Sequence, residues 1–142
     1  MPVRVFVLAL LFGGLCEAKT ACRIFVQPIS VVTEDGDRPI RDRIVERITA
    51  SGKCTVVTRV ELADGVLSGA GWVNPGQSNP SPGGGFERAG DAVLDVELKS
   101  QAGKMLWNER ITPRWLTLRH SRALADEAVR RLLAAQVKWS RP

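Results

Sequence analysis

The sequence predicts one α/β domain, a two-layer sandwich in which a mixed sheet of four or five strands carries two helices on one face, in the order βαβββα. Three observations support this class. Residues 22–60 pass from an apolar strand through an amphipathic helix to a second strand. Residues 89–111 contain an alternating strand and its hairpin partner, and residues 121–139 have apolar side chains at helical spacing. The length, 142 residues, suits a single hydrophobic core.

The strand–helix–strand unit sets the frame of the domain. Residues 23–29 are nearly all apolar and predict the first strand, whose regular pairing ends at Pro28. Residues 30–36 are predicted to be a polar link. Asp37 and Pro39 then have the properties of a helix cap and a first-turn residue. Gly52 ends the predicted helix, and its buried stripe is Ile40, Ile44 and Ile48.

Two cysteines occupy matching places in this unit. Cys22 directly precedes the first strand. Cys54 is the first residue of the second predicted strand, 54–60. Parallel neighbours begin at the same edge of a sheet, which would bring the two Cα atoms within the range that a disulfide needs. We therefore predict a bridge that closes a loop of about 30 residues and stabilises the fold by roughly 3 to 4 kcal/mol.

The remaining elements follow a simple pattern. A third, glycine-rich strand is predicted for 65–73, and a flexible connection rich in Pro, Gly and Ser for 74–88. Residues 89–100 alternate apolar and polar side chains, which is typical of a half-exposed strand. A glycine turn returns the chain along 104–111, and the final helix covers 121–139.

The amino-terminal residues 1–18 have the layout of a secretory signal peptide. Arg4 is followed by an apolar run too short for a comfortable membrane span, and Ala18 or Ala21 supplies the small residue before a cleavage site. A retained anchor is the alternative. Leu15 stands where a lipobox has Gly or Ala, so the sequence does not favour lipidation at Cys16. We expect an exported, periplasmic protein.

Basic residues gather in the last third of the chain. The net charge is +5, and residues 104–142 contain nine Lys or Arg against three acids. Such a segment is either a solvated face or a surface that attracts anionic lipid or cell-wall polymer. Nucleic acid is not an expected partner of an exported protein.

The pattern of these elements resembles small bacterial envelope domains. The residues that carry the resemblance are 24–28, Gly52, Val56-Val57, 63–69, 92–98, Gly103 and Leu106-Trp107. They are similar to the curli-secretion lipoprotein, the activator lipoproteins of penicillin-binding proteins and the amino-terminal domain of the Tol translocation protein. The resemblance implies roles in protein contacts and assembly, and it brings no catalytic residues.

No residue pattern predicts a catalytic, metal or cofactor site. His120 is the only histidine and lies at a helix entrance beside Arg119 and Arg122, so we interpret it as a surface or capping residue. Asp95 and Glu97 share one face of a strand with Lys99, where an exposed charged face is a commoner arrangement than a catalytic carboxylate pair.

We expect a non-enzymatic domain that contacts an envelope protein. The candidate surfaces are the sheet face with Asp95, Glu97 and Lys99, and the segment with Arg114, Trp115 and Arg119. An exposed Trp beside bases is typical of a partner or lipid interface, although Trp115 would also pack well over the helix entrance. The alternative is a peripheral binder of anionic lipid or cell-wall polymer, and an enzyme is the third hypothesis.

Overall fold

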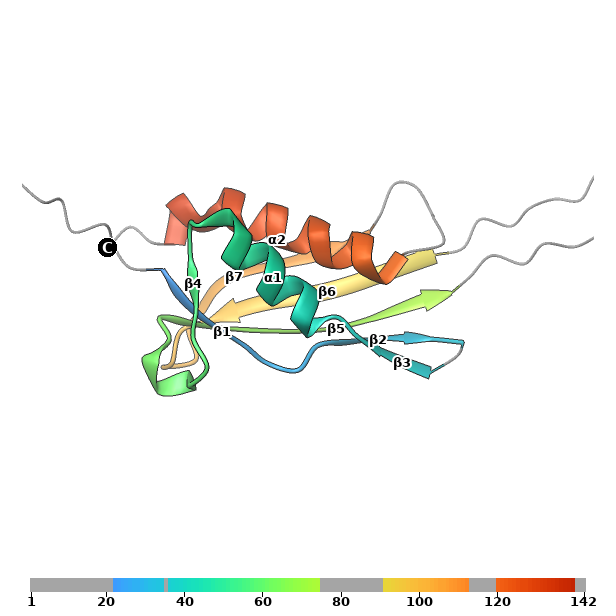
Figure 1. The fold of residues 1–142 in the computed structure, drawn as a ribbon, viewed down its shortest axis with the longest axis horizontal. Coiled ribbons are helices and arrows are strands. Elements are labelled where there is room, and N and C mark those ends of the chain that lie inside the picture. The colour runs from blue at the N-terminus through green and yellow to red at the C-terminus, as the bar shows by residue number, and fades with distance from the viewer. Residues whose placement is uncertain (1–21, 35, 75–90, 113–119, 140–142) are drawn as a thin grey trace, which may run out of the picture.

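The computed structural model describes residues 22–34, 36–74, 91–112 and 120–139. Both helices lie on one side of a mixed sheet, and the fold class is confirmed (Figure 1). Within these residues the sheet has seven strands, where four or five were expected. The elements are β1 (Arg23–Val26), β2 (Ser30–Thr33), β3 (Gly36–Pro39), α1 (Arg41–Ser51), β4 (Thr55–Val56), a short 3-10 helix η1 (Val60–Leu62), β5 (Gly65–Asn74), β6 (Asp91–Lys99), β7 (Met105–Ile111) and α2 (His120–Trp139).

Strand β5 is the centre of the sheet. One of its edges pairs with β6 in antiparallel register over 66–74. Its other edge pairs in parallel with β1 over its first residues and with β2 near its end. Strand β4 extends the sheet beyond β1, β3 extends it beyond β2, and β7 extends it beyond β6. Two short strands that follow one another in the chain therefore share one edge of a long strand.

Pro28 explains why β1 and β2 are separate strands. The last bond of this segment to β5 runs from the Gln27 amide to the Leu67 carbonyl, 2.9 Å away, and Pro28 has no amide hydrogen with which to continue. The carbonyl of Val26 instead accepts a hydrogen bond from Arg41 Nε at 2.9 Å. The expected end of regular pairing at Pro28 is confirmed.

The predicted polar link at 30–36 is wrong, because these residues form β2 and the start of a hairpin with β3. Gly36 adopts a φ of 109° at the reversal, a conformation that favours glycine. Pro39 lies at the end of β3, an edge strand, where a missing amide hydrogen is tolerated. The apolar pair Val31-Val32 is the sequence signal for this hairpin.

The predicted start of the first helix is also wrong. Asp37 and Pro39 belong to β3, and α1 begins at Arg41 with Ile40 in the cap position and no side-chain cap. The Ile40 amide donates a hydrogen bond to the Ile29 carbonyl at 2.9 Å, so the hairpin itself positions the helix entrance. The end of the helix is as predicted, with Gly52 in the left-handed conformation at φ 65°.

The disulfide between Cys22 and Cys54 is confirmed. The Cα atoms are 4.7 Å apart, and Arg23 pairs with Thr55 in the parallel register that the sequence predicts. Strand β4 is shorter than the expected 54–60, because after Val57, whose amide donates to the Ile24 carbonyl, the chain leaves the sheet and enters η1. The bridge therefore fixes the chain at the point where β1 and β4 both begin.

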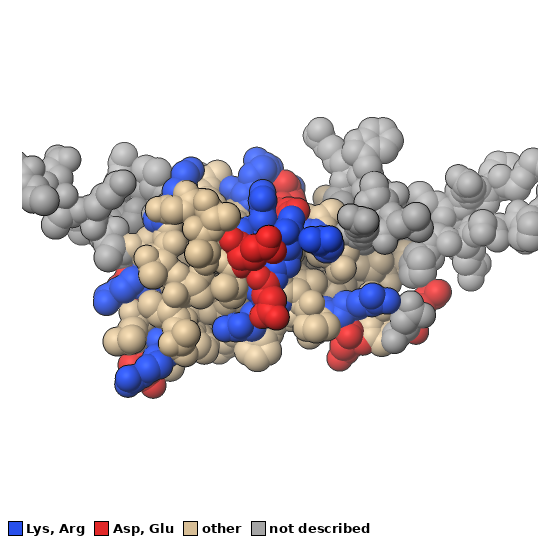
Figure 2. Space-filling view, in the orientation of Figure 1, with Lys and Arg blue, Asp and Glu red and all other residues tan. Residues whose placement is uncertain are grey.

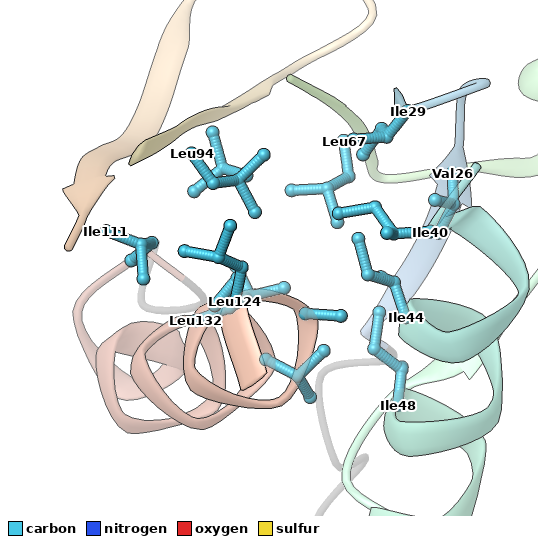
Figure 3. Packing of buried hydrophobic residues seen from close by; sticks show 14 of the residues in the cluster. Val26, Ile29, Ile40, Ile44, Ile48, Leu67, Leu94, Ile111, Leu124 and Leu132 are labelled. Carbon is cyan, nitrogen blue, oxygen red and sulfur yellow. The ribbon is translucent and has the colours of Figure 1, made fainter. Parts of the chain in front are cut away.

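The core lies between the sheet and the helices. Figure 3 shows Ile44 and Ile48 of α1 and Leu124 and Leu132 of α2 pointing towards side chains of the sheet such as Leu94. All five are fully buried or nearly so. Trp107 is partly buried and packs against this core, whereas the side chain of Trp139 lies outside the described residues.

Two glycines allow β5 and β6 to approach closely. A Cβ atom on Gly69 would lie 2.6 Å from the carbonyl oxygen of Asp95, and one on Gly71 would lie 2.5 Å from that of Val93. Real Cβ atoms essentially never come this close to a backbone oxygen. These two positions of β5 therefore pack closely against the backbone of β6. The signal peptide at 1–18, Cys16 and most of the expected loop 74–88 lie outside the described residues.

Replacing Gly71 by Ala is expected to destabilise the protein by about 1 to 3 kcal/mol, because the new methyl group must push two backbones apart. The matched control is Ala70→Ser on the same strand, where the side chain is exposed. Urea unfolding of both variants measures the effect. Equal midpoints for G71A and A70S would contradict the close approach.

Removing both thiols in Cys22→Ala/Cys54→Ala is expected to lower the free energy of unfolding by about 3 to 4 kcal/mol, since the chain without the bridge gains entropy when unfolded. Treatment of the unsubstituted protein with dithiothreitol should lower it by a similar amount and leave the double variant unchanged. A double variant as stable as the oxidised protein would contradict the bridge.

Candidate interaction surface

The sheet has one face that the described helices do not cover. Along β6, the side chains of Ala92, Leu94, Val96 and Leu98 are buried on the helical side, and those between them point the other way. The register carries this alternation to the neighbouring strands, because paired residues share a face. We call the uncovered side the open face; its members include Ser68, Ala70, Trp72, Asp95, Glu97, Lys99, Asn108 and Arg110.

The predicted residues Asp95, Glu97 and Lys99 lie together on the open face, each in an ion pair. Arg110 of β7 donates two hydrogen bonds to Asp95, at 2.8 and 3.0 Å. Lys99 donates to Glu97 at 2.7 Å. Hydrogen bonds from Arg110 hold the pKa of Asp95 below its usual range, and the bond from Lys99 does the same for the pKa of Glu97. These carboxylates are ionised structural partners, not a pair poised to share a proton.

A shallow hollow occupies the middle of the open face. Its volume is about 530 Å³, and its lining includes Ser68, Ala70, Asp95, Asn108 and Arg110. The hollow exists because β5 carries small residues here, while longer charged side chains rise from β6 and β7. Arg110 and Ser68 were not singled out from the sequence; their only signal was the alternation of the neighbouring strands.

Apolar side chains lie exposed at each end of the open face. At one end Val32 and Trp72 are neighbours in register and are 53% and 45% exposed. We call this pair the tryptophan patch. At the other end Val60 and Leu62 of η1 and Met105 of β7 are exposed. We call these three the methionine patch.

One glutamine joins the parts of the methionine patch. The side-chain amide of Gln101, in the β6–β7 turn, donates to the Val60 and Glu61 carbonyls at 3.1 Å and to the Ala63 carbonyl at 2.7 Å. These contacts hold η1 against the turn that leads into β7. In Figure 1 the short green coil of η1 lies on the side of the sheet away from both helices.

The second predicted surface lies outside the described residues. Arg114, Trp115 and Arg119 lie outside the described residues, and so does the side chain of His120, although α2 begins at that residue. Their suggested contact role stays a prediction.

Sequence reasoning missed the tryptophan patch. Trp72 was visible as a large apolar residue at the end of a predicted strand. Its neighbour Val32 was not, because the segment that forms β2 was interpreted as a link. The signal that could have revealed the patch is the apolar pair Val31-Val32, one side chain for each face of a strand.

The helical side of the protein carries charges of both signs. Figure 2 shows blue and red side chains adjoining one another in the middle of the view, over α1 and α2. Arg43 of α1 donates two hydrogen bonds to Asp126 of α2, at 2.8 and 3.0 Å. Arg47 lies 3.5 Å from the same carboxylate. A hollow of about 460 Å³ beside them is lined by Arg47, Asp126 and Leu133 among others.

The basic final third is partly neutralised within the fold. Arg130 and Arg131 both bind Glu127, and Arg131 also reaches Glu109 of β7 at 2.7 Å. Hydrogen bonds from the two arginines lower the pKa of Glu127 from 4.5 to about 2. Binding of anionic lipid or cell-wall polymer by this segment stays a prediction that these described contacts do not favour.

Within 22–34, 36–74, 91–112 and 120–139, no group of three or more His, Cys, Asp or Glu is arranged to hold a metal ion. None of the helices in those same ranges is long and apolar enough to cross a membrane.

Replacing Glu127 by Gln is expected to destabilise the protein at pH 7, because Arg130 and Arg131 lose their shared partner. Since the folded pKa is the lower one, the Glu127 contribution is complete above pH 4.5 and is lost as the pH falls towards 2. The loss of stability between these pH values should therefore be smaller in E127Q. Thermal unfolding across that range measures it.

The control for this comparison is Glu46→Gln, which removes an exposed carboxylate that pairs with Arg43. It should retain most of the pH dependence of the unsubstituted protein. Parallel curves for E127Q and the unsubstituted protein would show that Glu127 does not contribute in this way.

Comparison with known proteins gives a likeness of fold. No family model and no curated protein matches the sequence. Among solved structures, the PelC dodecamer from Paraburkholderia phytofirmans matches with a TM-score of 0.51 and 17% identity over 82% of this chain and 89% of that chain. At this identity the match shows the shared fold alone.

Two further solved structures are lipoproteins. Lipoprotein B from Nitrosomonas europaea has a TM-score of 0.41 and 15% identity over 82% of this chain and 83% of that chain. A minor lipoprotein from Acinetobacter baumannii has a TM-score of 0.36 and 5% identity over 82% of this chain and 91% of that chain. The expectation that Cys16 is not lipidated gains no support from these matches and stays a prediction. The chain is therefore similar in fold to PelC from Paraburkholderia phytofirmans.

Proposed function

We propose that this protein is an exported, non-enzymatic envelope domain that works by contacting another protein through the open face of its sheet. The observation that carries the proposal is the arrangement of that face. A polar hollow lies between two exposed apolar patches, and α1 and α2 cover only the opposite side.

The composition of the open face fits a protein partner. Exposed Trp and Met side chains supply apolar contact area, and Trp is among the residues that contribute most to binding at protein interfaces. The ion pairs of Asp95 and Glu97 supply a polar region that fixes orientation more than affinity. An apolar ligand pocket would instead be concave and enclosed, with few charges.

The chemistry of the charged residues on this face supports a role without catalysis. Asp95 and Glu97 are held ionised by their basic partners, and neither has a raised pKa of the kind that a general acid requires. The finer resemblance to the curli-secretion, penicillin-binding-protein activator and Tol group is part of the proposal. The fold match to a protein that forms a dodecamer adds support for an assembly role.

A photo-crosslinking amino acid at Ala70, in the hollow, is expected to give an adduct of defined mass in intact cells. The matched control is the same amino acid at Ala134, which is exposed on α2 on the other side of the protein. Gel mobility and mass spectrometry identify the adduct. No adduct at position 70, or the same adducts from both positions, would contradict the use of the open face.

A further inference from the structure

The two apolar ends of the open face are surrounded by charges of opposite sign. Beside the tryptophan patch, the described residues of the β2–β3 hairpin include two acids, Glu34 and Asp37, whereas Arg38 pairs with Val31 and shares the helical face. Asp37 pairs with Val32 in register and so shares its face. Beside the methionine patch lie two bases and one acid, Arg59, Lys104 and Glu61. The side chains of these five charged residues beside the patches are exposed.

The two ends lie on the same face, well apart. Val66 pairs with Lys99 and Lys99 with Met105, so the methionine patch is in register with the start of β5. Trp72 is six residues beyond Val66 on the same strand, which corresponds to about 20 Å at the rise of an extended chain. If a second copy is rotated by a half turn so that the two ends of its open face exchange places, the tryptophan patch of each copy lies over the methionine patch of the other.

The charges in the middle of the open face are compatible with the same rotation. It contains two acids, Asp95 and Glu97, and two bases, Lys99 and Arg110, in two ion pairs. A surface with both signs in equal number can meet a rotated copy of itself without net repulsion. The hollow beside these residues leaves room for ordered water, which bridges polar groups in many interfaces.

We propose that the partner of the open face is a second copy of this chain, related by a two-fold axis through the middle of that face. The tryptophan patch of each copy contacts the methionine patch of the other, twice in one dimer. Such an interface is closed and isologous, since the same surface is used by both copies. This inference rests on the proposed use of the open face and names its partner.

The opposite charges make the contacts selective. Two facing tryptophan patches would bring the acids Glu34 and Asp37 of both copies together, and two facing methionine patches would bring four bases and two acids together. In the crossed arrangement, each tryptophan patch meets the methionine patch of the other copy. Only this arrangement joins an acidic end to a basic end at both contacts. Because these charges are exposed, their attraction should weaken with added salt.

The test uses two variants that repel in opposite senses. Trp72→Lys adds a base opposite the basic end of the partner, and Leu62→Glu adds an acid opposite the acidic end. Each variant alone disturbs both contacts of its dimer and should sediment as a monomer.

Mixing the two variants should restore the dimer. In the mixed dimer one contact has no substitution in either patch. At the other contact the lysine introduced in W72K meets the glutamate introduced in L62E, so attraction replaces repulsion. The rescue depends on the crossed arrangement, because W72K and L62E face each other only when a tryptophan patch meets a methionine patch.

Sedimentation of the purified protein over about 1 to 100 μM, the range in which modest interfaces assemble, measures these states. Ala134→Glu on α2 is the control and should dimerise like the unsubstituted protein. Circular dichroism and urea midpoints establish that every variant is folded. The unsubstituted chain and the mixture are expected to be dimers. W72K alone and L62E alone are expected to be monomers.

Four results would overturn the proposal. An unsubstituted protein that is a folded monomer at every concentration means that the face does not bind itself. A single variant that still dimerises, or a mixture that stays monomeric, means that the two patches do not meet. A mass above the dimer means that the two-fold axis is wrong.

These outcomes are separable from the failure of the proposed function. If the unsubstituted protein is a monomer while position 70 crosslinks a different envelope protein, the self-pairing is wrong and the proposed function stands. If position 70 gives no adduct at all, the use of the open face is wrong and the self-pairing falls with it.

Discussion

The close pairing of β5 with β6 is the constraint on which the rest of the structure depends. Gly69 and Gly71 place no Cβ atom against the backbone of β6, so the ten residues of β5 can lie in one continuous strand along it. The other edge of the same strand then accepts β1 and β2 in succession. Because β5 joins both halves of the sheet, its alternation decides which side chains meet the helices and which form the open face.

Several features that the sequence predicts follow from local chemistry. The alternation in β6, the isoleucine stripe of α1 and the glycine at its end each specify a structure within a few residues, and all three are confirmed. The disulfide depended on one step more, the parallel pairing of two strands, and the 4.7 Å between the Cα atoms confirms it. The errors lie where pairing between strands outweighs the preference of single residues. Asp37 and Pro39 have the chemistry of a helix start, yet the antiparallel ladder with β2 holds them in an extended conformation. The same hairpin places Val32 beside Trp72, a contact between strands that no short-range pattern reveals. The candidate surface was therefore predictable in its charged middle and hidden at its apolar ends.

The charges of the fold have a common role on both sides of the sheet. On the helical side, Arg43 and Asp126 join the two helices, while Arg131 joins α2 to β7 through Glu109. On the open face, an ion pair between Arg110 and Asp95 joins neighbouring strands. Since each of these charges already has a partner within the chain, the exposed apolar residues are the groups that gain most from contact with another molecule.

Hydroxyl-radical footprinting of the purified protein over a range of concentrations tests the account most directly, since Trp72 and Met105 lie at opposite ends of the open face and their side chains are exposed and readily oxidised. The account predicts that both lose reactivity together as the concentration rises, while exposed side chains of α2 do not change. Reactivity of Trp72 and Met105 that is independent of concentration, or that falls at only one of them, would contradict it.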